Sequence, residues 1–215
     1  MMLHYVVASL TLLWTCHAQF PRAVTDTLRV INGGPHGIWT TDEFCPPHQF
    51  AVGYDMKIQY NQFTGDDTSL NAIALFCSDI QLRYYGEKRV TSGQSQFGAL
   101  KGGVICKPIG TAAFLTAFEM EVEGDQGDLD DTAAGYVKFK CTNMADDSVQ
   151  ELNMDPGYSF VGAWGDWSSS CPHGSAICGL KTRIEPNQGS GDDTALNDVI
   201  FYCCSFTESG AVVGK

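Results

Sequence analysis

The tripeptide Asp-Asp-Thr occurs three times in this sequence, each time nine residues before a cysteine. The threonines are Thr68, Thr132 and Thr194, and the cysteines are Cys77, Cys141 and Cys203. Each copy also begins with a cysteine close to a proline, in the stretches CPPHQF, CKPIG and CPHG. The copies start 64 and then 62 residues apart, which indicates three similar units in one chain.

Each unit contains a ten-residue stretch in which polar and apolar residues alternate: 53–62, 117–126 and 179–188. Period two is typical of a strand with one buried face and one face in water. The water-facing positions would include Asp55 and Lys57 in the first unit, and Glu119 and Glu121 in the second. In the third unit they would include Lys181 and Arg183.

A second strand is expected after each Asp-Asp-Thr. Its buried side would consist of Leu70, Ile73 and Leu75, of Val137 and Phe139, and of Leu196, Val199 and Phe201. The first residue of a set is out of step with the period of two, which predicts a β-bulge or the end of a turn near the start of the strand.

The connection between the two strands is rich in Gly, Asp and Asn, which indicates a turn. The repeated aspartates in it are Asp66, Asp67, Asp130, Asp131, Asp192 and Asp193. Aspartate in such a turn bonds its own backbone. Because a threefold structure needs three copies of a residue and an active site needs one, their recurrence favours a structural role.

The pattern predicts an all-β protein without a long helix. Three sheets that each bury one face can satisfy one another by closing around a central axis, which gives a three-sided prism with one apolar core. A two-sheet sandwich is the alternative, but three units divide badly between two sheets.

The first 18 residues contain no Asp, Glu, Lys or Arg, and their apolar run, 5–14, is too short to span a bilayer. Cys16 and Ala18 fit the positions that a signal peptidase reads. We therefore expect a signal peptide at 1–18, one domain at 19–208 with units at about 28–80, 88–144 and 150–204, and a flexible tail at 209–215. The product would be secreted to the extracellular space, without a membrane span.

Removing that leader leaves eight cysteines, an even number that implies disulfides in an oxidising compartment. The repeat pairs Cys45 with Cys77, Cys106 with Cys141, and Cys171 with Cys203. Cys178 and Cys204 exist only in the third unit and should pair with each other, although Cys171–Cys204 with Cys178–Cys203 stays open. No pair has the spacing of a zinc site, so no metal is expected.

The formal net charge of −12 disfavours binding to nucleic acid and to anionic membranes. It would favour neutral or basic partners, including basic proteins. We expect a monomer that associates with extracellular coat glycoproteins or with glycans.

Three tryptophans precede cysteines by four to seven residues: Trp39, Trp164 and Trp167. Tryptophan rings can stack on sugar faces, and Asp166 or Glu43 could accept hydrogen bonds from hydroxyls. These residues are the candidates for glycan binding. The alternative is that the rings fill the core and the ends of the prism, as large aromatic residues usually do.

Motifs for catalysis are missing: the sequence has no HExxH, GxSxG or phosphate-binding loop, and no cofactor is expected. Carboxylates are the remaining option, since glycoside chemistry needs two of them about 5–10 Å apart. Glu123 and Glu185 lie just upstream of the Asp-Asp-Thr motifs in the second and third units. The acidic stretch 123–131 lacks the spacing of an EF-hand loop, which favours a solvated turn over a calcium site.

The stretches WGDWSSSCPHG and CGLKTRIEPNQGSGDDTALND and the closing FYCC resemble the vitelline membrane outer layer protein 1 family. The second unit departs from the pattern, with LDDT in place of GDDT and Phe97-Gly98-Ala99 where a tryptophan is expected. The resemblance implies a β-prism of three Greek-key sheets about a pseudo-threefold axis and an extracellular structural role. It also implies an alternative activity, transfer or elongation of N-acetylglucosamine oligosaccharides, without catalytic residues to carry over.

Overall fold

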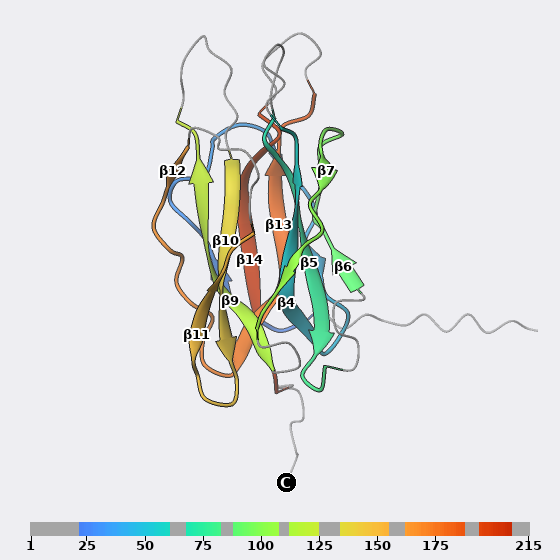
Figure 1. Cartoon of the computed structure of the whole chain (residues 1–215). Coiled ribbons are helices and arrows are strands. Elements are labelled where there is room, and N and C mark those ends of the chain that lie inside the picture. Colours follow the sequence, from blue (N-terminus) through green and yellow to red (C-terminus); the bar gives the residue numbers. More distant parts are fainter. Residues whose placement is uncertain are drawn as a thin grey trace, which may run out of the picture.

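The computed structural model describes residues 22–60, 68–82, 88–107, 112–124, 134–154, 162–187 and 194–207. These residues form three antiparallel sheets whose long strands run along the same axis (Figure 1). The chain is therefore an all-β prism, as the repeat predicts, and not a two-sheet sandwich. The expected leader at 1–18 and the tail at 209–215 lie outside the described residues.

Each sheet is built on one long hairpin. The hairpins are β4 (Gln49–Ile58) with β5 (Leu70–Asp79), β9 (Ala113–Val122) with β10 (Ala134–Asn143), and β13 (Ser175–Ile184) with β14 (Leu196–Ser205). Sheets 1, 2 and 3 are named here after these hairpins, in chain order. All six strands overlap the segments expected in each unit, but the first strand of each hairpin begins and ends four residues earlier than its predicted stretch.

Shorter strands flank each hairpin. Sheet 1 has the order β6-β5-β4-β7, with β6 (Lys88–Val90), β7 (Ala99–Leu100), and β8 (Val104–Ile105), which also pairs with β4. Sheet 2 has the order β11-β10-β9-β12, with β11 (Val149–Leu152) and β12 (Ala163–Trp164). In both sheets the strand after the hairpin pairs beside it and the chain then returns to the opposite side, which is a Greek key.

Sheet 3 is completed by the N-terminal part of the described chain. Its order is β1-β14-β13-β2, with β1 (Val24–Leu28), β2 (Ile38–Trp39), and β3 (Glu43–Phe44), which pairs with β13. The short strands before each hairpin thus pair with the preceding hairpin of the ring: β2 and β3 with β13, β7 and β8 with β4, and β12 with β9. This exchange closes the prism and couples each unit to the next.

The core lies on the axis, where side chains from all three sheets meet. The Phe139 ring of sheet 2 lies 4.6 Å from the Tyr54 ring of sheet 1 and 5.2 Å from the Phe201 ring of sheet 3. All eight residues predicted for the buried sides of the second strands are fully buried in this core. The predicted alternation is therefore confirmed on the inner face.

The threonine of the repeated motif holds the start of the second strand. Thr68 and Thr194 are buried, and each accepts a hydrogen bond from an asparagine amide three residues later, Asn71 at 2.8 Å and Asn197 at 2.6 Å. The register shifts at these asparagines, so the predicted bulge is confirmed. The six repeated aspartates lie outside the described residues.

Four disulfides cross-link the described chain: Cys45–Cys77, Cys106–Cys141, Cys171–Cys203 and Cys178–Cys204, the last of which joins the two long strands of sheet 3. The first three are the pairs related by the repeat, and the fourth is one of the two arrangements that the sequence leaves open. At the matching positions of sheet 2, the hydroxyls of Thr116 and Thr142 lie 2.7 Å apart. A hydrogen bond there takes the place of the fourth disulfide.

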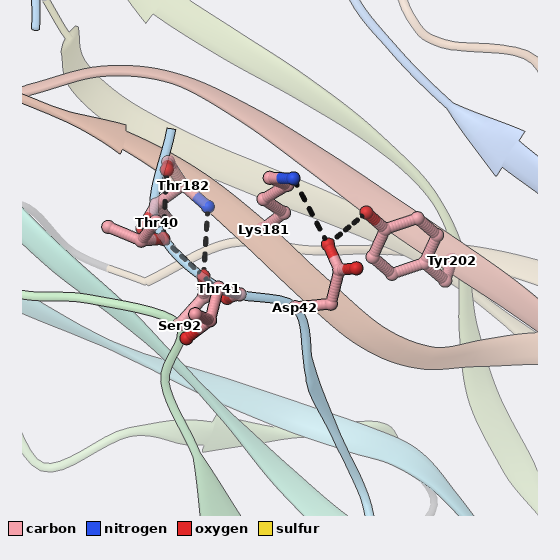
Figure 2. Close-up of polar contacts among 7 residues, drawn as sticks. All are labelled: Thr40, Thr41, Asp42, Ser92, Lys181, Thr182 and Tyr202. Atoms are coloured by element: carbon pink, nitrogen blue, oxygen red, sulfur yellow. Dashed lines mark hydrogen bonds and ion pairs between the residues drawn. The ribbon is translucent and has the colours of Figure 1, made fainter. Parts of the chain in front are cut away.

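The links between outer strands cross from one sheet to the next. Ser92, which follows β6 of sheet 1, accepts the Thr182 N–H of sheet 3 at 3.1 Å and donates to Thr41 O at 2.6 Å (Figure 2). Asn32 donates from the β1–β2 link of sheet 3 to Met120 O of sheet 2 at 2.9 Å. These contacts satisfy polar groups at the corners of the prism and fix the orientation of the sheets.

The prediction that the outer face of the first strands is wet was wrong at several positions. Asp55 is fully buried, and Glu119 and Glu121 are 7% and 8% exposed. The reason is that the returning segments lie over the outer edge of these strands: Asp55 accepts the N–H groups of Lys101 and Gly102 at 3.0 and 3.2 Å.

In the described part of the chain, no helix has the length and apolar character needed to cross a membrane.

Candidate functional site

The structure places the four predicted glycan-binding residues on two different sheets. Trp164 lies on β12 opposite Glu121 of sheet 2, and Asp166 and Trp167 follow it in the same segment. Trp39 lies on β2 opposite Arg183 of sheet 3. The sequence candidates therefore form one group of three on sheet 2 and one separate ring on sheet 3.

Two lysines of β10 extend the group on sheet 2. The Lys138 ammonium lies 4.4 Å from the centroid of the Trp164 ring and 5.3 Å from that of Trp167. The Lys140 ammonium lies 4.2 Å from the Trp167 centroid. Because residues two apart on a strand share a face, the side chains form a continuous row of alternating rings and ammonium groups. Each such contact contributes about 0.5–2 kcal/mol, depending on how dry it is.

Sequence reasoning missed these lysines. A signal for them exists in the segment Tyr136-Val137-Lys138-Phe139-Lys140, where the lysines take the outward positions between buried residues. Nothing in that alternation says which segment crosses above them. The lysines lie close to the tryptophans because β12 pairs with β9. β12 is only two residues long and has no periodic signal of its own.

Carboxylates complete the same surface. The Glu119 carboxylate forms an ion pair with Lys138 at 3.0 Å, and the Glu121 carboxylate accepts the Gly162 N–H at 3.2 Å. Burial raises the pKa of Glu121, and the Gly162 hydrogen bond partly offsets this. We name this surface the sheet 2 face; it consists of Glu119, Glu121, Lys138, Lys140, Trp164, Asp166 and Trp167.

Apolar rings and hydrogen-bonding groups of both signs stand side by side on the sheet 2 face. The Trp164 side chain remains 40% exposed although it carries a lysine on its ring. A sugar ring has an apolar C–H face and polar hydroxyls at its edge, and such a surface can contact both.

The fold does not require the whole row, because the other two sheets build the same backbone with other side chains at most of these positions. The residue that corresponds to Trp164 is Leu100 in sheet 1 and Trp39 in sheet 3. Each lies opposite the same position of its long strand, Lys57 and Arg183 respectively. Lys140 corresponds to Phe76 and to Tyr202, which pair with Gly53 and Gly179. The row of rings and lysines is therefore particular to sheet 2.

Sheet 3 carries its own polar group near Trp39. Tyr202 donates its phenolic hydrogen to Asp42 Oδ1 at 2.6 Å, and the Lys181 ammonium lies 3.5 Å from the same oxygen (Figure 2). Phe44 stacks on the Tyr202 ring with the centroids 5.1 Å apart. Burial and, to a lesser extent, the hydrogen bond and negative charge of Asp42 raise the pKa of Tyr202 to about 12.

This shift predicts a loss of stability in alkali. A tyrosine of the unfolded chain ionises near pH 10, whereas folded Tyr202 keeps its proton up to about pH 12. Since the unfolded state alone releases a proton in this window, the stabilisation is complete below pH 10 and is lost as the pH rises towards 12. Thermal unfolding of the wild type and of Tyr202→Phe across this window checks it: the unfolding temperature of the variant should fall less. Parallel curves for the two proteins would contradict the prediction.

The other carboxylates considered for catalysis have structural contacts where they are described. Glu185 accepts both the hydroxyl and the N–H of Thr194, at the turn into β14. Most of the acidic stretch 123–131 and all six repeated aspartates lie outside the described residues. Within the described ranges, no three side chains of His, Cys, Asp or Glu are grouped so that they could hold a metal ion.

Comparison with known proteins gives one family. The family model for vitelline membrane outer layer protein I (VOMI) matches residues 26–206. The vitelline membrane outer layer protein 1 homolog of Homo sapiens is 40% identical over 182 residues, which are 84% of this chain and 83% of that protein. The homolog of Mus musculus is 40% identical over 180 residues, 82% of each chain.

Among solved structures, a mannose-specific jacalin-related lectin from Morus nigra, in complex with mannose, matches with a TM-score of 0.47 and 12% identity. The alignment covers 87% of this chain and 97% of the lectin. The Calystegia sepium agglutinin matches with a TM-score of 0.49 and 14% identity over 85% of this chain and 98% of the agglutinin.

Proposed function

Since this chain belongs to the vitelline membrane outer layer protein I family, we propose that it is a secreted structural protein of an extracellular coat that binds glycans through its sheet 2 face. The observation that carries the proposal is the row formed by Trp164, Lys138, Trp167 and Lys140 on one outer face. The partners would be coat glycoproteins of the mucin type or their free glycans.

The chemistry of the sheet 2 face suits an uncharged or weakly charged sugar. The tryptophan rings offer apolar area for the C–H face of a pyranose, which gives affinity without many ordered side chains. The Lys138 and Lys140 ammonium groups that lie on the rings can donate hydrogen bonds to neighbouring hydroxyls. Asp166 is exposed next to Trp167 in the sequence and can supply an acceptor.

The construction of the chain supports a structural role outside the cell. The four disulfides each stabilise the fold by about 2–4 kcal/mol. We propose that the chain reaches this compartment through a leader cleaved after Ala18. The net charge of −12 would also favour association with basic proteins of the same coat.

Glycosyl transfer by carboxylates gains no support from the described side chains. Glu119 is neutralised by Lys138, and Glu185 is committed to Thr194. A binding protein is therefore the reading that the described geometry favours.

Replacing Trp164 by alanine tests the proposed site. We expect retention on an immobilised mucin-type glycoprotein, or on a hexamer of N-acetylglucosamine, to weaken about tenfold, because one stacked ring contributes about 1–1.5 kcal/mol. Calorimetry with the hexamer and pull-down with the glycoprotein measure this, and circular dichroism verifies the fold.

Leu100→Ala is the matched control, since Leu100 occupies the same register position on sheet 1 and is 50% exposed. It should leave retention unchanged. Equal losses in the two variants would point to a general effect of the short strands, and no loss in Trp164→Ala would refute the sheet 2 site.

A further inference from the structure

We propose that sheet 3 carries a second glycan site around Trp39, so that one monomer joins two glycan chains. This inference rests on the proposed function of the sheet 2 face and adds the number of sites to it. It gives the chain a role as a cross-linker of the coat polymer, where a single site would give only attachment to it.

The backbone presents Trp39 as it presents Trp164. Trp39 lies opposite Arg183 of β13, and Trp164 lies opposite Glu121, the corresponding residue of β9. After each tryptophan the chain reaches a cysteine whose N–H bonds to the long strand of the same sheet. The Cys45 N–H bonds to Cys178 O and the Cys171 N–H bonds to Thr116 O, both at 2.8 Å. The two rings therefore occupy equivalent places on two sides of the prism.

The position of Trp39 is fixed by its surroundings. Gly37 precedes it with a φ of 78°, and a Cβ there would lie 2.4 Å from the carbonyl carbon of Ile184, so this tight turn admits only glycine. Arg183 donates from Nε to Gly37 O at 3.1 Å. These contacts fix the backbone of the turn that leads into Trp39.

The polar groups on the same sheet as Trp39 match hydroxyls better than an ion. Lys181 lies two residues before Arg183, the residue opposite Trp39, and therefore on the same face of β13. Asp42, Lys181 and Tyr202 meet at one carboxylate oxygen, at 2.6 Å for the phenol and 3.5 Å for the ammonium (Figure 2). Asp42 and the Lys181 side chain are 47% and 29% exposed, so their remaining donors and acceptors face solvent. Because charges of both signs are already paired, a strongly anionic or cationic ligand gains little, whereas a sugar can bond to both.

Sheet 1, the remaining side of the prism, lacks the tryptophan. Its equivalent residues are Leu100 in place of the tryptophan and Gly103 in place of Asp42; the latter has φ of 79° and packs against Phe76. Two sites on different sides of a prism face in different directions and cannot be bridged by one short oligosaccharide. Each monomer would therefore hold two separate chains, and linked binding of this kind raises the avidity by about a hundredfold or more.

The test mixes the full secreted chain with beads coated with a mucin-type glycoprotein, following bead aggregation by light scattering and bound protein by pull-down. The wild type should aggregate the beads. Trp39→Ala and Trp164→Ala should each still bind, but should need about tenfold more protein than the wild type to aggregate the beads, because each loses one stacked ring. The double variant should do neither, and Leu100→Ala should behave as the wild type.

Asp42→Ala is the second variant for sheet 3, because its exposed side chain can be removed without disturbing the fold; it should weaken aggregation in the same direction. Aggregation by Trp39→Ala and Asp42→Ala at the wild-type concentration would overturn the second site and leave the sheet 2 site standing. Full binding and aggregation by Trp164→Ala would instead refute the proposed function, and a wild type that binds no beads would refute both. Size-exclusion chromatography with light scattering must show a monomer, since a dimer that cross-links through one site per chain would also overturn the proposal.

Discussion

Phe139→Ala is expected to lower the free energy of unfolding by about 3–5 kcal/mol. Phe139 is fully buried, and its ring touches Tyr54 and Phe201 of the other two sheets as well as Phe118 of its own. Removing it leaves a cavity on the axis that none of the three sheets can fill alone, because each is held at the corners by links to its neighbours. Urea unfolding with the disulfides intact gives the value from the shift of the midpoint.

Two controls separate the cavity from a general loss of apolar area. Phe139→Leu keeps most of the volume and should cost clearly less than the alanine variant. Ile31→Ala changes a side chain that is 91% exposed and should stay within about 0.5 kcal/mol of the wild type. A loss below about 1 kcal/mol for Phe139→Ala would mean that the sheets are stable without a shared core.

The long strands could be predicted from the sequence because their signal is local. Alternation at 53–62, 117–126 and 179–188 predicts a strand wherever it later pairs, and the repeat then gives the number of sheets. The bulges could be predicted for the same reason, since a break in the period is visible in the residues themselves, as at Leu70 and Leu196.

The exchange of short strands could not be predicted. β2 and β12 are two residues long and pair through backbone groups, which the side chains do not specify. Their partners follow from closure of the ring, a property of the whole chain. The same holds for the site: the tryptophans are recognisable in the sequence as candidates, but Lys138 and Lys140 become part of it only because β12 pairs beside β9.

The burial of Asp55 could not be predicted from the sequence either, and removing its carboxylate is the second change for which we expect a large loss of stability. The sequence places it on the wet side of β4, yet the return segment covers it and directs N–H groups of Lys101 and Gly102 at its carboxylate. The Arg89 guanidinium lies 3.7 Å away at the edge of this site. Removing a buried carboxylate leaves these donors without an acceptor, which costs more than the loss of one neutral hydrogen bond.

We therefore expect Asp55→Ala to lower the free energy of unfolding by about 3 kcal/mol. Lys181→Ala is the matched control, because Lys181 occupies the corresponding position of sheet 3 but its side chain is 29% exposed and its ion pair with Asp42 lies at the surface. That change should cost less than about 1 kcal/mol. Urea midpoints of both variants, together with hydrogen exchange of the Lys101 and Gly102 amides, measure the difference. Equal costs, or unchanged exchange at these two amides in Asp55→Ala, would show that strand pairing alone holds the return segment of sheet 1 and that the carboxylate does not fix it.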